Sequence, residues 1–282
     1  LFRTCLMGNA EVAGVLAPYA DYLIASEEVI WLGNASSVLS FLNDIGPDDN
    51  AIDFGKKYIE SYNQFMSIVD PYEEKINCHA IIDLDKIDEV FNEIDNFFDD
   101  VTLSKSFSKI SRQRSLIYQF GSSAGVQDID TIYDFLNNIS DYSSYDVDNV
   151  LDAIEEAVVY NYSNDEDFYG LSLYFPYGGS ISSIKYLLNV YDSFEFGKKY
   201  NSFIDSFYNM KKNGSSKSLT MSAIGSVDTE IRGNEFKLQL TEEQVSDFAT
   251  ARYMVFRKVE NDYFMPVFSS YNAILNSDGV LY

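Results

Sequence analysis

The sequence has 282 residues, of which 46% are hydrophobic and 23% charged, a globular composition that excludes disordered and collagen-like chains. Asp and Glu total 44 against 20 Lys and Arg, which gives a formal net charge of -24. This charge repels phosphate backbones and anionic lipids, so we expect neither a nucleic-acid partner nor a membrane-surface partner. No segment approaches the roughly 20 apolar residues that a membrane-spanning helix needs.

The chain contains two cysteines, Cys5 and Cys78, and one histidine, His79. A structural zinc site needs about four Cys or His ligands, so the sequence excludes one. The acidic clusters at 83–89 and 165–167 lack the twelve-residue calcium loop with its central Gly and terminal Glu. We therefore expect no metal ion and no cofactor, and no motif supports calcium. Nothing in the pattern favours a disulfide between the two cysteines.

Helical and strand patterns alternate along the first 210 residues. In chain order they predict a helix over 6–20 that Pro18 interrupts, a buried strand over 21–26, helices over 39–45 and 54–69, a strand over 80–84 and helices over 85–98, 129–139 and 147–159. A buried strand over 171–175 and helices over 183–191 and 196–210 follow. Such alternation is typical of an α/β domain.

The pattern changes after residues 211–218, a Gly, Ser and Lys segment with no apolar residue that is typical of a linker. Beyond it, short strands are predicted over 236–240, 251–259 and 262–268. We therefore expect two domains, an α/β domain over 1–212 and a small β-rich C-terminal module over 219–282.

Residues 5–11 (CLMGNAE) and 20–28 (ADYLIASEE) resemble the catalytic-cysteine region of the clostripain family of cysteine peptidases. The resemblance continues at 80–87 (AIIDLDKI), 130–136 (DTIYDFL), 151–162 (LDAIEEAVVYNY) and 170–176 (GLSLYFP). Together these segments extend it over roughly residues 5–210.

The resemblance implies a caspase-like αβα sandwich, with the C-terminal part of the sheet in this chain and the first strands absent. It also implies a secreted or cell-surface bacterial cysteine endopeptidase that cleaves protein or peptide substrates after Arg or Lys, and often autoprocessing into two chains. Its Cys-His dyad would use Cys5 as the nucleophile. A thiol at a strand end, followed by a helix from Leu6, suits this role because a helix N-terminus stabilises a thiolate. The backbone N–H of Cys5 would then serve in the oxyanion hole.

The general base is the difficulty in this interpretation. In the family the histidine precedes the cysteine on another strand, whereas this sequence offers only His79. Neighbouring side chains point apart on a strand, so adjacency does not make Cys78 and His79 a dyad. We read His79 as a surface or core-edge residue, and we expect the base in an upstream segment or light chain that this sequence lacks.

The family usually reads Asp-Ala-Cys, and its aspartate pairs with the basic substrate side chain. Here that position is Arg3, which would repel a basic substrate and favour an acidic or neutral one, or mark an inactive member. Glu27 and Glu28 are then the remaining acidic candidates for a basic pocket, and the competing interpretation makes them solvated loop carboxylates. The alternative function is a catalytically inactive, peptidase-like surface or binding protein.

Overall fold

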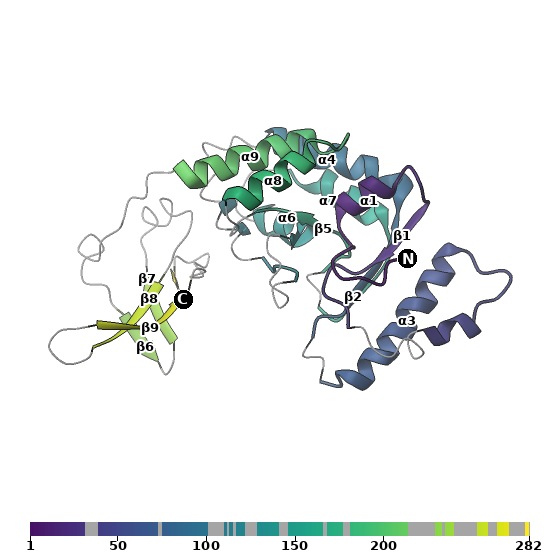
Figure 1. The fold of residues 1–282 in the computed structure, drawn as a ribbon, viewed down its shortest axis with the longest axis horizontal. Coiled ribbons are helices and arrows are strands. Elements are labelled where there is room, and N and C mark those ends of the chain that lie inside the picture. Colours follow the sequence, from purple (N-terminus) through teal and green to yellow (C-terminus); the bar gives the residue numbers. More distant parts are fainter. Residues whose placement is uncertain are drawn as a thin grey trace. The chain divides into compact units, whose positions relative to one another are not determined.

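The computed structural model describes residues 1–31, 39–72, 75–100, 110–111, 113–114, 117–121, 129–140, 146–165, 168–176, 181–213, 229–232, 235–239, 253–258, 264–270 and 280–281 (Figure 1). The chain divides into two compact units. The first comprises residues 1–101 and 117–205, and the second comprises residues 102–116 and 206–282. No helix in the described ranges is both long and apolar enough to cross a membrane.

A three-stranded antiparallel sheet of order β1-β2-β4 organises the first unit. Its strands are β1 (Tyr22–Ala25), β2 (Cys78–Asp83) and β4 (Val158–Ser163). The N-terminal residues run parallel to β1, because Phe2 N–H donates to the Ile24 carbonyl at 2.9 Å and Leu6 N–H to the Glu28 carbonyl at 3.3 Å.

One end of this sheet collects segments that are far apart in the sequence. Ala25 lies opposite Ala80, and Cys78 lies opposite Ser163, so β1 and β4 finish where β2 begins. The parallel N-terminal segment reaches the same end at Cys5. We call this the Cys5 end of the sheet.

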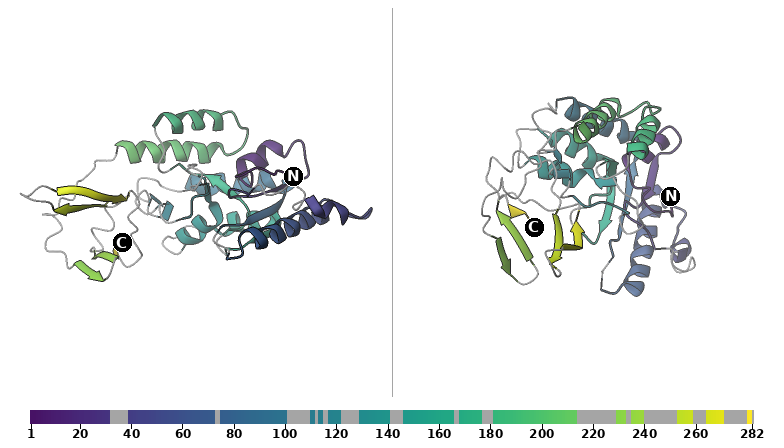
Figure 2. Two further views of the ribbon diagram at one scale, coloured as in Figure 1. Left: turned by 60° about the horizontal axis from the view of Figure 1, so that its bottom comes forward. Right: turned by 60° about the vertical axis from the view of Figure 1, so that its left-hand side comes forward.

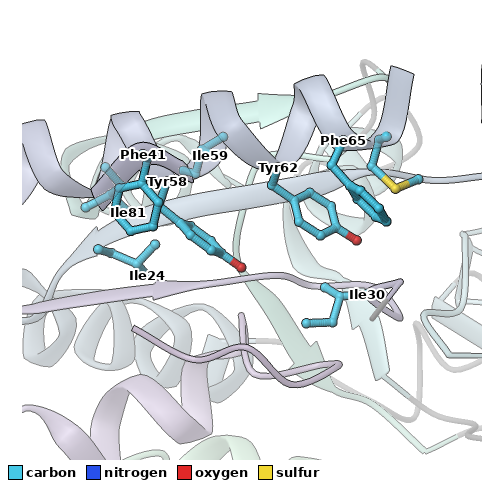
Figure 3. Packing of buried hydrophobic residues seen from close by; sticks show 9 residues of the cluster. Ile24, Ile30, Phe41, Tyr58, Ile59, Tyr62, Phe65 and Ile81 are labelled. Atoms are coloured by element: carbon cyan, nitrogen blue, oxygen red, sulfur yellow. The ribbon is translucent and has the colours of Figure 1, made fainter. Parts of the chain in front are cut away.

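Helix α3 (Ala51–Val69) covers one face of the sheet (Figures 1 and 3). Asn50 caps it through a reciprocal capping box with Asp53, which satisfies backbone donors in its first turn. Its apolar side chains pack on Ile24 and Ile81 and form a buried cluster with Phe41 of the 3-10 helix η1 (Leu39–Asn43). The members of this cluster, here called the α3 cluster, are Ile24, Ile30, Phe41, Tyr58, Ile59, Tyr62, Phe65, Met66 and Ile81.

Helices α1 (Ala10–Leu16), α4 (Ile87–Asp100) and α7 (Asp148–Ala157) lie on the opposite side of the sheet from α3 (Figures 1 and 2). A 3-10 turn, η2 (Leu84–Lys86), leads into α4. The amphipathic pattern predicted for this region is confirmed, because α4 buries Ile87, Val90, Phe91, Ile94, Phe97 and Phe98. The remaining elements of this part of the chain are β3 (Ile129–Thr131), α6 (Ile132–Ser140), β5 (Ser172–Tyr174), α8 (Ile181–Tyr191) and α9 (Lys198–Asn213).

Several boundaries differ from the sequence-based prediction. The helix expected over 129–139 is wrong at its start, because Ile129–Thr131 form strand β3, which pairs with β5, and α6 begins at Ile132. The helix expected from residue 6 begins at Ala10, because the Asn9 side chain caps it by accepting from Val12 N–H. The helix expected over 147–159 ends at Ala157, where β-branched Val158 and Val159 open strand β4. The first residues of the expected linker, 211–213, complete α9, whereas 214–218 lie outside the described residues.

The strands described in the second unit form two sheets. One has the order β10-β7-β6, built from β6 (Thr229–Arg232), β7 (Glu235–Gln239) and β10 (Val280–Leu281). The other pairs β8 (Tyr253–Lys258) with β9 (Phe264–Ser270) in antiparallel register. Strands β7, β8 and β9 coincide with predicted strands, whereas the sequence pattern did not indicate β6 or β10. The division into domains at 212 and 219 stays a prediction.

Candidate active site

Cys5 is a free, partly exposed thiol at the Cys5 end of the sheet. Its S–H group points at the Ile30 carbonyl, with the sulfur 3.9 Å from the oxygen, and its side chain packs against the α3 cluster. The next residue, Leu6, has a left-handed backbone with φ 63°. A non-glycine residue in this region costs on the order of 1–2 kcal/mol, so the surrounding structure holds a strained turn directly after the thiol.

Packing and hydrogen bonds brace this turn on both sides. The Asn9 side chain donates to the Leu6 carbonyl at 2.6 Å. Gly8 N–H donates to the Ser26 carbonyl at 2.8 Å, while the Gly8 carbonyl accepts from both the backbone and the hydroxyl of Ser172 at 3.0 Å. A Cβ at Gly8 would lie 2.8 Å from the Glu27 nitrogen, so the turn approaches the end of β1 too closely for any other residue. Because this turn separates Cys5 from α1, the expected direct junction of thiol and helix is wrong.

Tyr62 anchors the backbone beside Cys5. Its hydroxyl accepts from Trp31 N–H at 2.8 Å and donates to the Trp31 carbonyl at 3.3 Å. Burial raises the pKa of Tyr62 to about 12, so the hydroxyl stays protonated and can make both bonds. Figure 3 shows the hydroxyls of Tyr58 and Tyr62 pointing from α3 toward the side on which Ile24 and Ile30 lie.

Arg3 lies on the α3 side of the sheet, near Tyr58. Burial raises the pKa of the Tyr58 hydroxyl, and the positive charge of Arg3 acts in the opposite direction. The half-buried Arg3 therefore interacts with a residue of the α3 cluster, two positions before the thiol.

His79 is enclosed by aromatic side chains of the α3 cluster. Its ring centroid is 4.5 Å from that of Tyr62 and 5.7 Å from that of Tyr58, and the residue is 1% exposed. Burial lowers the pKa of His79 to about 3, and neither ring nitrogen has a hydrogen-bond partner among the described residues. The prediction of a surface or core-edge histidine is wrong, because α3 covers this position of β2.

Cys78 points to the other face of the sheet. It is 1% exposed and packs with Phe120 and Phe168, and its sulfur lies 3.8 Å from the Ser26 hydroxyl. Burial strongly raises the pKa of the Cys78 thiol, and the nearby Glu27 raises it further. This thiol therefore stays protonated at neutral pH.

Glu27 and Glu28 are both buried, so their interpretation as solvated loop carboxylates is wrong. Glu28 accepts hydrogen bonds from Val29 N–H at 2.6 Å, Gly121 N–H at 2.9 Å and the Tyr118 hydroxyl at 2.9 Å. These bonds fasten segment 117–121 to the Cys5 end of the sheet.

Glu27 occupies a more apolar position than its neighbour. Its Oε2 accepts from Gly170 N–H at 2.8 Å, whereas its Oε1 has no hydrogen-bond partner among the described residues. Burial raises the pKa of Glu27 to about 8, and the charge of Glu28 contributes in the same direction. Glu27 is therefore largely protonated at neutral pH.

The structure thus places Arg3 and Cys5 beside the α3 cluster, and Glu27 at Cys78 on the opposite face. Sequence reasoning missed Tyr62 and Trp31, although Trp31 is the one tryptophan of the sequence and closely follows the acidic pair. Within the described part of the chain, no three His, Cys, Asp or Glu side chains gather to hold a metal ion. The expectation that the protein uses no cofactor stays a prediction.

Comparison with known proteins adds a family match over most of the chain. The sequence profile of the Clostripain family matches residues 1–207. No curated protein gives a significant sequence match. A "B. fragilis cysteine protease" is structurally similar with a TM-score of 0.52 and 17% identity, over 73% of this chain and 86% of that chain. This similarity supports the fold alone.

Two further solved structures show weaker similarity, with TM-scores of 0.48. A clostripain from Bacteroides thetaiotaomicron ATCC 29148, in complex with the peptide inhibitor BTN-VLTK-AOMK, is 19% identical over 65% of this chain and 81% of that chain. An inactive zymogen C11 protease from Parabacteroides distasonis is 18% identical over 69% of this chain and 56% of that chain.

Proposed function

Since the chain belongs to the clostripain family of cysteine peptidases, we propose that it is a cysteine endopeptidase with Cys5 as its nucleophile. The observation that carries this proposal is the setting of Cys5, a partly exposed thiol on a strained, braced turn at the end of a sheet. Cys78 is enclosed and protonated, so Cys5 is the thiol that a substrate can reach.

In the proposed reaction, the Cys5 sulfur attacks the scissile carbonyl and forms a tetrahedral intermediate, whose oxyanion accepts a hydrogen bond from Cys5 N–H. The C–N bond then breaks, and the leaving amine takes the proton that the base removed from the thiol. Water hydrolyses the resulting thioester and regenerates the thiol. The α3 cluster behind Cys5 gives this chemistry a rigid, apolar wall.

His79 does not fit the role of base, because aromatic rings enclose it and burial keeps it neutral. We therefore assign the base to a histidine outside residues 1–282, in an upstream segment or a separate light chain produced by processing. The same proposal includes the caspase-like sandwich and a secreted or cell-surface location.

For specificity, we propose cleavage after Arg or Lys. Arg3 interacts with Tyr58 of the α3 cluster. This contact supports a position for Arg3 outside the pocket that binds the substrate side chain. The test compares kcat/KM for peptide substrates with Arg, Lys, Asp or Ala directly before the scissile bond. It uses the native protein and the variants Arg3→Asp and Arg3→Gln. Equal preference for basic substrates in all three is expected. Cleavage of Arg and Lys substrates that appears only in Arg3→Asp would show that Arg3 prevents basic side chains from binding in the pocket.

The second candidate is an inactive, peptidase-like binding protein, favoured by the enclosure of the one histidine in the sequence. The native, full-length protein separates the two candidates through variants Cys5→Ala and Cys78→Ala. We expect Cys5→Ala to lower kcat/KM by at least about 1,000-fold, the scale seen for nucleophile removal, and Cys78→Ala to stay within about twofold. A native protein without peptidase activity, or with activity that survives Cys5→Ala, would contradict the proposal.

A further inference from the structure

Trp31 presents an exposed aromatic ring next to the proposed nucleophile. The residue is 48% exposed, and it directly follows Ile30, whose carbonyl lies 3.9 Å from the Cys5 sulfur. Both backbone groups of Trp31 are fixed by the Tyr62 hydroxyl, at 2.8 and 3.3 Å. An exposed indole on a fixed backbone is well suited to contact a ligand, because little ordering is needed when the ligand binds.

A cation already occupies the face of this ring. The Lys75 ammonium lies 3.6 Å from the Trp31 ring centroid. The backbone of Lys75 is held on both sides, since its N–H donates to the Asp70 carboxylate at 2.8 Å and its carbonyl accepts from the Asn164 side chain at 2.9 Å. Only the flexible side chain can leave the ring without disturbing the fold. At an exposed site such a cation–π contact favours the bound position of the ammonium by only roughly two- to fivefold.

A polar pocket of about 50 Å³, which Lys75 itself lines, provides a second location for the Lys75 ammonium. Asp70, Lys75, Asn77 and Asn164 are among its lining residues. Asn77 is 6% exposed, and its side-chain oxygen has no hydrogen-bond partner among the described residues. A displaced ammonium would find a carboxylate and this amide oxygen as acceptors.

We propose that the exposed face of Trp31 is a subsite for a cationic substrate side chain, and that Lys75 is an internal occupant which competes with the substrate for it. The buried Glu27 and Glu28 are already used by internal partners, so an aromatic face supplies the cation recognition that carboxylates would otherwise provide. This inference rests on the proposed peptidase function and names Trp31 and Lys75 as specificity-determining residues.

The first test compares kcat/KM for two peptide substrates that differ only in lysine against norleucine, its uncharged isostere. Lys75→Met removes the competitor and should raise the lysine-to-norleucine ratio about two- to fivefold. Trp31→Leu should lower the same ratio. Ratios that stay at the native value in both variants would overturn the proposal.

Lys56→Met is the matched control for the charge change. Lys56 also lies over an aromatic ring, that of Tyr160, at 5.4 Å. It sits in the first part of α3, whose beginning borders Leu1 and Asp21 at the other end of the sheet. Both lysine variants remove one positive charge from the molecule. A lysine-to-norleucine ratio that rises equally in both would therefore show long-range electrostatic attraction of the substrate and contradict a subsite at Trp31.

A binding measurement keeps this inference separate from the proposed function. In Cys5→Ala, the affinity for acetyl-Ala-Lys-amide, measured by titration calorimetry, should fall about two- to fivefold when Trp31→Leu is introduced. Lys75→Met in the same background should tighten binding about two- to fivefold. If Trp31-dependent binding is found but the native protein has no peptidase activity, the proposed function is refuted and the subsite is kept. If the native protein is active but binding does not depend on Trp31, the function is kept and the subsite is refuted.

Discussion

Cys5 and Cys78 lie at the same end of one sheet, but their surroundings give them opposite chemistry. Cys5 is partly exposed on a strained turn, with its sulfur facing the Ile30 carbonyl. Cys78 is enclosed by Phe120 and Phe168, where burial strongly raises its pKa. The comparison teaches that the sheet brings both thiols to one end, and that the direction of each side chain then decides which can react.

The regions around the two thiols also differ in what their polar groups do. Beside Cys5, the Tyr62 hydroxyl fixes a backbone that remains open to solvent at Trp31. Beside Cys78, Glu27 and Glu28 bind backbone donors of other segments, and neither carboxylate faces solvent. We infer that the Cys5 region is built for access and the Cys78 region for stability.

The largest effect expected from this contrast concerns Gly170 on the Cys78 side. Its φ is +100°, and a Cβ there would lie 2.5 Å from the Ala80 Cβ. Gly170→Ala combines backbone strain with overpacking, so we expect a loss of about 3 kcal/mol in the free energy of unfolding, measured with urea. Gly46→Ala is the control, since its Cβ would meet nothing closer than 3.9 Å. Equal stability of the two variants would show that this side tolerates repacking.

A smaller effect, over the interval from pH 6.5 to 8, concerns the pH dependence of stability. The pKa of Glu27 is raised to about 8, so the Glu27 carboxyl is protonated in the folded state and ionised in the unfolded state between about pH 4.5 and 8. Stability therefore falls as the pH rises through this window, by at most about 1.4 kcal/mol per pH unit. His79 acts in the opposite direction, but only between about pH 3 and 6.5, because its folded pKa is about 3.

Glu27→Gln isolates this contribution between pH 6.5 and 8, where His79 no longer titrates. The variant keeps an acceptor for Gly170 N–H and loses the titrating carboxyl. Urea unfolding at pH 6.5 and 8 should show a flatter pH dependence than in the native protein. An unchanged slope would mean that Glu27 is not protonated when the protein is folded.

The smallest expected difference concerns the stability contributed by each thiol. Cys78→Ala removes a fully buried sulfur and should cost about 1–2 kcal/mol, whereas Cys5→Ala should change stability by less than about 0.5 kcal/mol. Thermal unfolding of both variants measures the difference. A larger loss in Cys5→Ala would place Cys5 in the core.

The sequence was informative wherever local pattern determines structure. Apolar spacing located α3 and α4, and a short apolar run located β1, because burial on one face leaves its period in the sequence. The family prediction, drawn from the motif around Cys5, is confirmed by the match over residues 1–207. The roles of Cys5 and Arg3 remain predictions.

Long-range contacts were beyond the reach of the pattern. The acidic pair Glu27 and Glu28 reads as solvated until Gly121 and Gly170, some 93 and 143 residues away, place their N–H groups against it. His79 likewise reads as peripheral until α3 is seen to cover it. The cation over Trp31 depends on a similar contact, since Lys75 is distant in sequence.

Alkylation mapping tests the central claim most directly. The native, full-length protein should be treated briefly with iodoacetamide near neutral pH, quenched with excess thiol, digested and mapped by mass spectrometry. We predict that Cys5 carries the adduct well before Cys78, and that peptidase activity disappears in step with the labelling of Cys5. Preferential labelling of Cys78, or full activity after Cys5 is labelled, would contradict the assignment of Cys5 as the nucleophile.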